Sequence, residues 1–212
     1  MIRIEWERAA LALSHIKIRG SRWNGPVKIE GTAPGFECVG VGTDAAVFRH
    51  RELTDVVFKV YSSQATVKKE TEESVYLRLG KSPYFPALYG KGSNYIVLSY
   101  EEGITLFDCL VEGIEVPEQA IQDVEEARRY TRSIGLNPRD IHLKNVLLQQ
   151  GRGKVIDVSE YARPGNDQRW EHLLWGYRFI YPYLRGRKVP VWVLEAIKRF
   201  YKGLALLFRR RK

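Results

Sequence analysis

The hydrophobic periodicity changes along this chain, and that change constrains the fold more than any other feature of the sequence. Between residues 36 and 100, short β-branched and aromatic runs separated by turns are typical of strands, with one helical stretch at 65–80. The strand-like runs are FECVG, AVFRH, DVVFKVY, PALYG and YIVLSY. Beyond residue 103 the pattern is mainly helical, with helices expected at 104–112, 117–134, 167–184 and 190–208 and a loop-and-strand section at 136–160. A β-rich half followed by a helical half predicts an α+β protein with two lobes.

The same pattern predicts four parts in the chain. Residues 1–34 read as a leader, with an amphipathic helical stretch near Trp6 to Ile16 followed by a turn-rich segment. The other parts are a small antiparallel β-rich N-lobe at 35–100, a minimal helical C-lobe at 101–188 and a basic amphipathic helix at 189–212.

Charge is distributed unevenly over these parts. The formal net charge is +9, yet residues 1–184 contain 24 basic and 24 acidic residues, while residues 185–212 contain ten basic residues and one acidic residue, Glu195. A neutral body argues against a protein that binds nucleic acid over its whole surface. The basic end is expected either to dock on the C-lobe with a solvated basic face or to engage an anionic membrane surface; nucleic acid is the less favoured partner.

Cysteine content and apolar run length indicate the cellular compartment. Two cysteines, Cys38 and Cys109, are too few for a disulfide framework and lack the spacing of a zinc site. Residues 1–13 are interrupted by charges, and no run reaches the ~18 apolar residues that span a bilayer. We therefore expect a cytoplasmic protein, with peripheral membrane association through the basic end as a further option.

A glycine-rich turn lies between the first two predicted strands. Its sequence, from Gly40 to Val47, is GVGTDAAV. Glycines at this spacing let backbone N–H groups approach a phosphate without an intervening Cβ. The surrounding strand-turn-strand pattern argues against a dinucleotide-binding fold, which needs a helix after the turn. A purely structural hairpin glycine pair is the alternative.

Lys59 lies inside the apolar strand VVFKVY. An ammonium group in such a strand must either reach solvent or find an anionic partner, because burying it unpaired is costly. Glu70, Glu72 and Glu73 on the following helix compete for this role. We favour Glu72 because Tyr76 follows it at i+4 on the predicted buried stripe, although all three could be solvated surface charges.

The most specific motif is PRDIHLKNVLL at 138–148, followed by KVIDV at 154–158. Asp140 and Asn145 lie in a loop that enters an apolar strand, and Asp157 ends another apolar strand. Such a set suits phosphoryl transfer, in which one carboxylate orients the nucleophile while Asn and a second Asp hold Mg²⁺. Hard oxygen ligands fit Mg²⁺ better than Zn²⁺. A pair of Asx turns is the structural alternative.

In this order and spacing, the motifs resemble those of the protein-kinase-like superfamily. Within it the chain is similar to short bacterial serine/threonine kinase-like proteins and to compact atypical kinases of the RIO and Bud32 type, over about residues 36–180. The resemblance implies a bilobal protein-kinase-like fold with a truncated C-lobe. It also implies that ATP and Mg²⁺ are the cofactors.

The resemblance assigns a role to each site residue. Asp140 matches the catalytic aspartate, Lys59 the lysine on the α/β phosphates and Glu72 its ion-pair partner, while Asn145 and Asp157 match the metal ligands. The residues implied to contact ATP are those of the glycine-rich turn, the strand lysine and the hinge before Glu101, namely Gly40, Val41, Gly42, Ala45, Val47, Lys59, Leu98, Ser99 and Tyr100.

Several positions depart from the family pattern. Ala45 stands at the third glycine position, Pro138 replaces the usual His of H-R-D, and Val158 and Ser159 replace the Phe and Gly of D-F-G. These changes keep open a pseudokinase or nucleotide-binding module.

Other departures concern the acceptor side. His142 gives the D-x-H-x-x-N form that resembles small-molecule kinases, although a structural loop role is equally open. No A-P-E sequence follows Asp157, so a long peptide-binding activation loop is absent. Asp167 could brace the catalytic loop or cap a helix. The leading hypothesis is an ATP- and Mg²⁺-dependent serine/threonine protein kinase, with a sugar or lipid hydroxyl kinase as an alternative.

Overall fold

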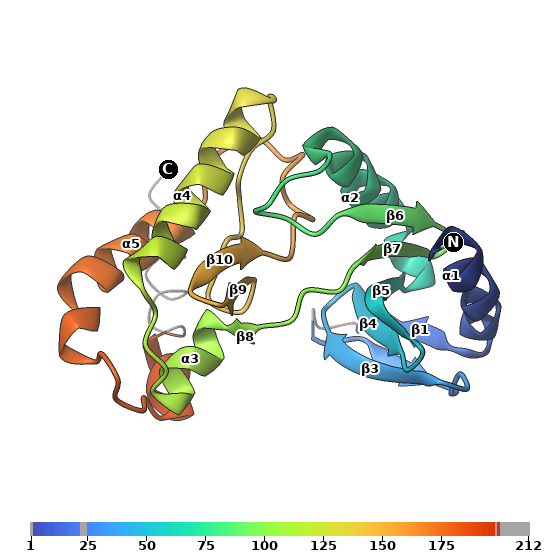
Figure 1. Ribbon diagram of the computed structural model, residues 1–212, viewed down its shortest axis with the longest axis horizontal. Coiled ribbons are helices and arrows are strands. Elements are labelled where there is room, and N and C mark those ends of the chain that lie inside the picture. The colour runs from blue at the N-terminus through green and yellow to red at the C-terminus, as the bar shows by residue number, and fades with distance from the viewer. Residues whose placement is uncertain (1, 22–24, 198, 200–212) are drawn as a thin grey trace.

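The chain folds into two lobes of α+β class, as the sequence predicts. The computed structural model describes residues 2–21, 25–197 and 199. Figure 1 shows a sheet-rich lobe, coloured blue to green, beside a helical lobe coloured yellow to red, and the segment after strand β7 crosses from one to the other.

Five antiparallel strands form the N-lobe sheet, in the order β3-β4-β5-β7-β6. The strands are β3 (Phe36–Val41), β4 (Ala45–His50), β5 (Leu53–Tyr61), β6 (Leu88–Lys91) and β7 (Tyr95–Ser99). Helix α2 (Thr66–Leu79) connects β5 to β6 through a short 3-10 turn, η2 (Ser63–Ala65), and a loop. All five predicted strands and the predicted helix are confirmed.

The described residues among the first 34 pack on the outer face of this sheet. They comprise α1 (Ile2–Ala10), the 3-10 helix η1 (Leu11–His15) and an antiparallel pair, β1 (Lys17–Arg19) and β2 (Lys28–Glu30), which the sequence pattern did not predict. Trp6 and Leu13 share one apolar cluster with Phe58 of β5. A Cβ on Gly90 would come within 2.3 Å of the Trp6 ring, so only glycine allows this approach.

The C-lobe is built mainly from helices. Its elements are β8 (Ile104–Thr105), α3 (Leu106–Glu112), α4 (Glu118–Ser133), β9 (Val146–Gln149), β10 (Arg152–Val155), α5 (Arg169–Phe179) and the 3-10 helix η3 (Tyr181–Tyr183). The expected helix at 167–184 is shorter, because Pro182 lacks the N–H that would continue the α-helical ladder beyond α5. Residues 191–197 are helical, and most of the remaining predicted C-terminal helix lies outside the described residues.

Helix α2 connects the cores of the two lobes. Val75, Tyr76 and Leu79 are buried in a cluster that continues into the C-lobe. The Tyr76 hydroxyl donates to the Ile156 carbonyl at 3.3 Å, and the Tyr130 hydroxyl on α4 donates to the Leu79 carbonyl at 2.6 Å. These contacts fix the helix that carries Glu72 against the loop that carries Asp157.

A buried carboxylate, that of Asp123, joins α4 to β10. It accepts two hydrogen bonds from Arg152, both at 2.8 Å, and one from the Gly153 N–H at 2.9 Å. Burial alone would raise the pKa of Asp123, but these donors hold it below its usual range. The carboxylate is therefore charged in the folded protein.

Replacing Asp123 by alanine should lower the free energy of unfolding by about 2 kcal/mol, because the buried Gly153 N–H loses its acceptor. The exposed Arg152 contributes little to this figure. Because the folded pKa is lowered, the stabilisation is present above the unfolded pKa of about 3.8 and is lost as the pH falls through the folded value. Urea unfolding at pH 7 measures the loss of stability in Asp123→Ala, and the same measurement at pH 3 shows whether the difference from the wild type shrinks. Glu126→Ala, on the exposed face of the same helix, is the control, and an equal loss in both variants would contradict the assignment.

Candidate functional site

The glycine-rich turn closes the hairpin between β3 and β4. Gly40 pairs with Val47, and the Gly42 N–H donates to the Ala45 carbonyl at 2.8 Å. A Cβ on Gly40 would lie 3.7 Å from Val47, an ordinary contact, and neither glycine has positive φ. The hairpin itself therefore does not require glycine at position 40, and the missing side chain leaves that surface open to a ligand.

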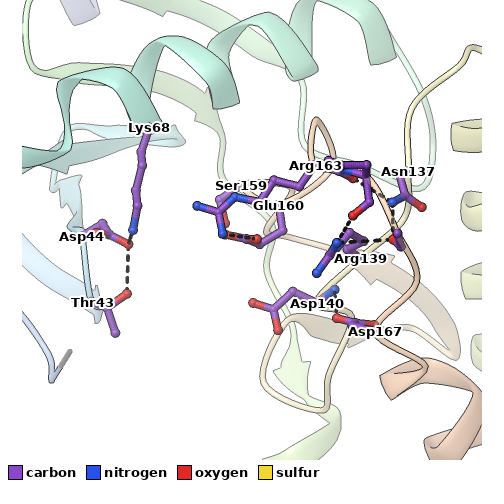
Figure 2. A network of polar contacts seen from close by, with 12 residues as sticks. Thr43, Asp44, Lys68, Asn137, Arg139, Asp140, Ser159, Glu160, Arg163 and Asp167 are labelled. Carbon is purple, nitrogen blue, oxygen red and sulfur yellow. Dashed lines mark hydrogen bonds and ion pairs between the residues drawn. The ribbon is translucent and has the colours of Figure 1, made fainter. Parts of the chain in front are cut away.

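The tip of this turn is tied to helix α2. Lys68 donates to the Asp44 carboxylate at 2.6 Å, and the Thr43 hydroxyl donates to the same oxygen at 3.0 Å (Figure 2). The sequence analysis missed this link, because an exposed lysine 24 residues away carries no local signal.

Lys59 forms a buried ion pair with Glu72. Its Nζ lies 2.6 Å from Glu72 Oε1, and the Tyr61 hydroxyl donates to Oε2 at 2.8 Å. Glu70 is exposed, and Glu73 pairs instead with Lys69 and Lys91. The preference for Glu72 as the partner is confirmed.

Asp157 approaches the same ammonium from the C-lobe. Its Oδ1 lies 3.6 Å from Lys59 Nζ and accepts the Ser159 N–H at 3.0 Å. Burial alone would lower the pKa of Lys59, but Asp157 and Glu72 raise it above its ordinary value. Burial alone would raise the pKa of Asp157, but Lys59 and Ser159 lower it. Lysine and carboxylate therefore face each other as charged groups across the two lobes.

The loop with Asp140 has a strained backbone. Asp140 adopts a left-handed φ of 56°, which is uncommon outside glycine. Its N–H donates to Asp167 Oδ2 at 2.8 Å, and its carbonyl accepts from Asn145 Nδ2 at 3.2 Å. Asp167 thus braces this loop, and it also accepts the N–H of Arg169 at 3.2 Å at the start of α5. His142 Nδ1 accepts the Lys144 N–H at 3.3 Å, a structural contact within the loop.

Arg169 is a site residue that the sequence did not reveal. Its guanidinium forms an ion pair with the Asp140 carboxylate, and its Nε lies 3.7 Å from Asp167 Oδ2. The Arg169 side chain is 43% exposed, whereas Asp140 Oδ1, the carboxylate oxygen of this pair, is buried. No sequence spacing links position 169 to position 140. The two side chains come into contact because Asp167, two residues before Arg169, binds the Asp140 N–H.

The segment from 157 to 167 is held on the loop that carries Asp140. The Asn137 side chain donates to the carbonyls of Arg163 and Gly165, and Arg139 donates to that of Pro164 (Figure 2). Of its two hydroxyl-bearing side chains, Tyr161 is buried, and Ser159 is anchored through its N–H to Asp157. The segment is short and is anchored by these contacts.

The hinge region links β7 to β8. The N–H groups of Ser99 and Tyr100 donate to the carbonyls of Ala87 and Asp55, both at 2.8 Å. The sheet therefore uses the N–H groups of two residues that the family resemblance assigns to ATP contact. Glu101, at the next position, is anchored to Lys154 of β10 at 2.6 Å.

Asn145 and Asp157 provide oxygen atoms that suit a divalent cation. Asn145 uses its side-chain NH₂ on the Asp140 carbonyl, so its Oδ1 is the atom left for a cation. The Asp157 carboxylate is ionised. One anionic and one amide oxygen are ligands that Mg²⁺ accepts. Among the described residues, no cluster of three or more His, Cys, Asp or Glu forms a separate metal site.

Comparisons with known proteins identify relatives that are named as kinases. No family model matches the chain. A protein of Bacillus subtilis (strain 168) named "Putative serine/threonine-protein kinase YrzF" is 34% identical over 202 residues, which cover 91% of each chain. A Gallus gallus "Dual serine/threonine and tyrosine protein kinase" is 41% identical over 81 residues, 36% of this chain and 9% of that protein.

Two further similarities cover smaller parts of the chain. The Mus musculus "Testis-specific serine/threonine-protein kinase 3" is 34% identical over 70 residues, 31% of this chain and 26% of its own. A crystal structure of the Rad53 kinase domain and SCD2 matches with a TM-score of 0.47 and 21% identity, over 59% of this chain and 50% of that chain.

Proposed function

Since the chain belongs to the protein-kinase-like superfamily, we propose that it is an ATP- and Mg²⁺-dependent phosphotransferase, most economically a serine/threonine protein kinase. One observation carries the proposal. Residues from β5, from α2 and from the loop after β10 converge, with Lys59 Nζ 2.6 Å from Glu72 and 3.6 Å from Asp157. A buried lysine held between two carboxylates is pre-organised to meet a polyphosphate.

ATP would lie between the lobes. The glycine-rich turn from Gly40 to Val47 would cover the phosphates, and Lys59 would contact the α and β phosphates. The sheet already uses the N–H groups of Ser99 and Tyr100. At the hinge, adenine would therefore form hydrogen bonds with the backbone carbonyls of Leu98 to Tyr100 and with the N–H of Glu101. Asn145 and Asp157 would hold Mg²⁺, which neutralises phosphate charge when bound.

The acceptor hydroxyl would approach Asp140. The brace from Asp167 holds this residue in its left-handed conformation, so its carboxylate is positioned before the acceptor arrives. The Asp140 carboxylate would accept the hydroxyl proton while Arg169 keeps it oriented.

A kinase for a sugar or lipid hydroxyl is a second candidate. The short and fixed segment at 157–167 favours it, because no long loop is present there to bind an extended peptide. Phosphorylation of a metabolite pool rather than of protein would distinguish this candidate. In either case we propose that the enzyme works in the cytoplasm.

Binding of Mg²⁺-ATP should raise the melting temperature. At ~100 times its dissociation constant a ligand that binds only the native state adds about 2.7 kcal/mol, or very roughly 5 to 10 °C for a chain of this size. Differential scanning fluorimetry with and without Mg²⁺ measures the shift. Unchanged melting with Mg²⁺-ATP would refute a nucleotide site, and a shift without phosphate transfer would favour a binding module.

Gly40→Ala separates nucleotide binding from folding. The added methyl meets only an ordinary contact in the protein but occupies the surface that phosphate would approach, so we expect normal stability and a smaller ATP-induced shift. Gly176→Ala is the matched control, because a Cβ there meets nothing within 4 Å and lies on α5 away from the turn.

A further inference from the structure

Large apolar side chains are exposed at one end of the C-lobe. Of the fourteen described as exposed, seven fall between residues 175 and 197: Trp175, Phe179, Ile180, Tyr183, Val191, Trp192 and Ile197. Trp175 and Phe179 stand one turn apart on α5 with ring centroids 5.5 Å apart, and both are more than half exposed. We call this stretch, residues 175–199 as far as they are described, the distal face. Seven such side chains within 23 residues exceed the isolated exposed residues that are ordinary on a protein surface.

Basic side chains accompany these apolar groups. The exposed cations of the distal face are Arg178, Arg185, Arg187, Lys188 and Arg199. Glu195 is the one acidic residue in the sequence between 172 and 199. Arg185 is paired with Glu115 at 3.5 Å, so the positive charge of this face rests on Arg178, Arg187, Lys188 and Arg199, and five further cations follow residue 199 in the sequence.

The distal face lies away from the candidate site. In Figure 1, α5 and the segment after it form the end of the C-lobe opposite the five-stranded sheet. A large partner on the distal face would therefore lie away from Lys59 and the carboxylates beside it.

The chemistry of the distal face fits a lipid surface better than a second copy of the chain. Tryptophan and tyrosine place an apolar ring and a polar tip at the level of lipid headgroups, and Arg and Lys add attraction to anionic lipids. Two copies of a face with this charge would repel each other. Within the described residues no helix is both long and apolar enough to cross a bilayer, so contact would be peripheral.

We propose that the distal face docks the protein on an anionic lipid bilayer. The exposed rings enter the headgroup region, and the surrounding cations contact lipid phosphates. The inference does not depend on the proposed kinase activity.

Vesicle sedimentation of the full chain tests the proposal. Binding is expected to phosphatidylcholine vesicles that contain phosphatidylglycerol and to be weak with phosphatidylcholine alone. The double substitution Phe179→Ser with Trp192→Ser should reduce partitioning at least ~10-fold. Arg187→Gln and Lys188→Gln should each reduce it about fivefold at low salt. Leu77→Ser, at an exposed apolar position on α2, is the matched control and should bind as the wild type does.

Four results would overturn the proposal. The first is absence of binding to anionic vesicles. The second is equal binding by the wild type and the ring variant, with circular dichroism showing both folded. The third is concentration-dependent dimerisation abolished by the same variant, which would make the face a self-association surface. The fourth concerns truncation after Arg199. The truncated chain should bind vesicles more weakly, and its binding should still be sensitive to Trp192→Ser. If it bound no vesicles at all, the C-terminal residues alone would be the contact. The ATP-induced shift in melting temperature should be unchanged in every distal-face variant.

Discussion

Asp140→Asn should lower kcat for phosphate transfer about 1,000-fold while leaving the Mg²⁺-ATP melting shift intact. The fall in kcat follows from the loss of a positioned proton acceptor, which typically accelerates a reaction 10²–10⁴-fold. Asparagine tolerates the left-handed conformation of position 140, and its N–H still donates to Asp167, so the loop should keep its shape. Nucleotide binding should survive, because the residues proposed to hold ATP are unchanged.

The measurement is ATP turnover with a panel of generic acceptors, wild type against variant. Asp55→Asn, at an exposed position of β5, is the matched control and should keep normal turnover. Equal residual activity in the wild type and Asp140→Asn would remove the catalytic assignment. If neither protein transferred phosphate and the melting shift persisted in both, the chain would be a nucleotide-binding module.

Glu72→Ala should have the largest effect on stability. The substitution leaves the Lys59 ammonium buried with only Asp157 nearby, at 3.6 Å, and removes the acceptor of the Tyr61 hydroxyl. Breaking a buried ion pair from one side typically costs 3–5 kcal/mol; we expect about 3 kcal/mol here because Asp157 remains. Urea unfolding measures the loss. Glu70→Ala, exposed on the same helix, should change the stability by less than about 0.5 kcal/mol.

A double substitution separates stability from function at this pair. Lys59→Met combined with Glu72→Leu removes both charges and fills the space with apolar groups, which is often neutral for stability. We expect recovery of most of the free energy lost in Glu72→Ala and no recovery of phosphate transfer. Activity in the double variant would show that the pair is structural and that the phosphates are held elsewhere.

Element types could be predicted because they depend on local periodicity. The β-branched and aromatic run DVVFKVY and the helical spacing at 65–80 predicted β5 and α2 within a few residues of their observed limits. The pair β1 and β2 was missed, because three-residue strands in a glycine-rich segment carry too short a pattern. The expected helix at 167–184 overran because Pro182 breaks the hydrogen-bond ladder after α5.

Contacts within the candidate site could be predicted only in part. Glu72 was preferred over its neighbours because helical spacing placed it beside the buried stripe, and it pairs with Lys59. The contacts of Arg169 with Asp140 and of Arg139 with Pro164 join residues more than 20 positions apart, and no spacing encodes them. The use of the Ser99 and Tyr100 N–H groups by the sheet depends on which strand lies beside each hinge residue.

The sequence by itself determined the order of most strands and helices, the residue types that suit phosphoryl transfer and the concentration of positive charge after residue 184. Periodicity, residue chemistry and net charge are properties of the chain that do not depend on which segments meet. Tertiary structure alone decided that Asp157 completes the environment of Lys59, that Asp167 braces Asp140, and that the apolar side chains of the distal face stay exposed. Each of these depends on packing between segments far apart in sequence, which local preferences do not specify.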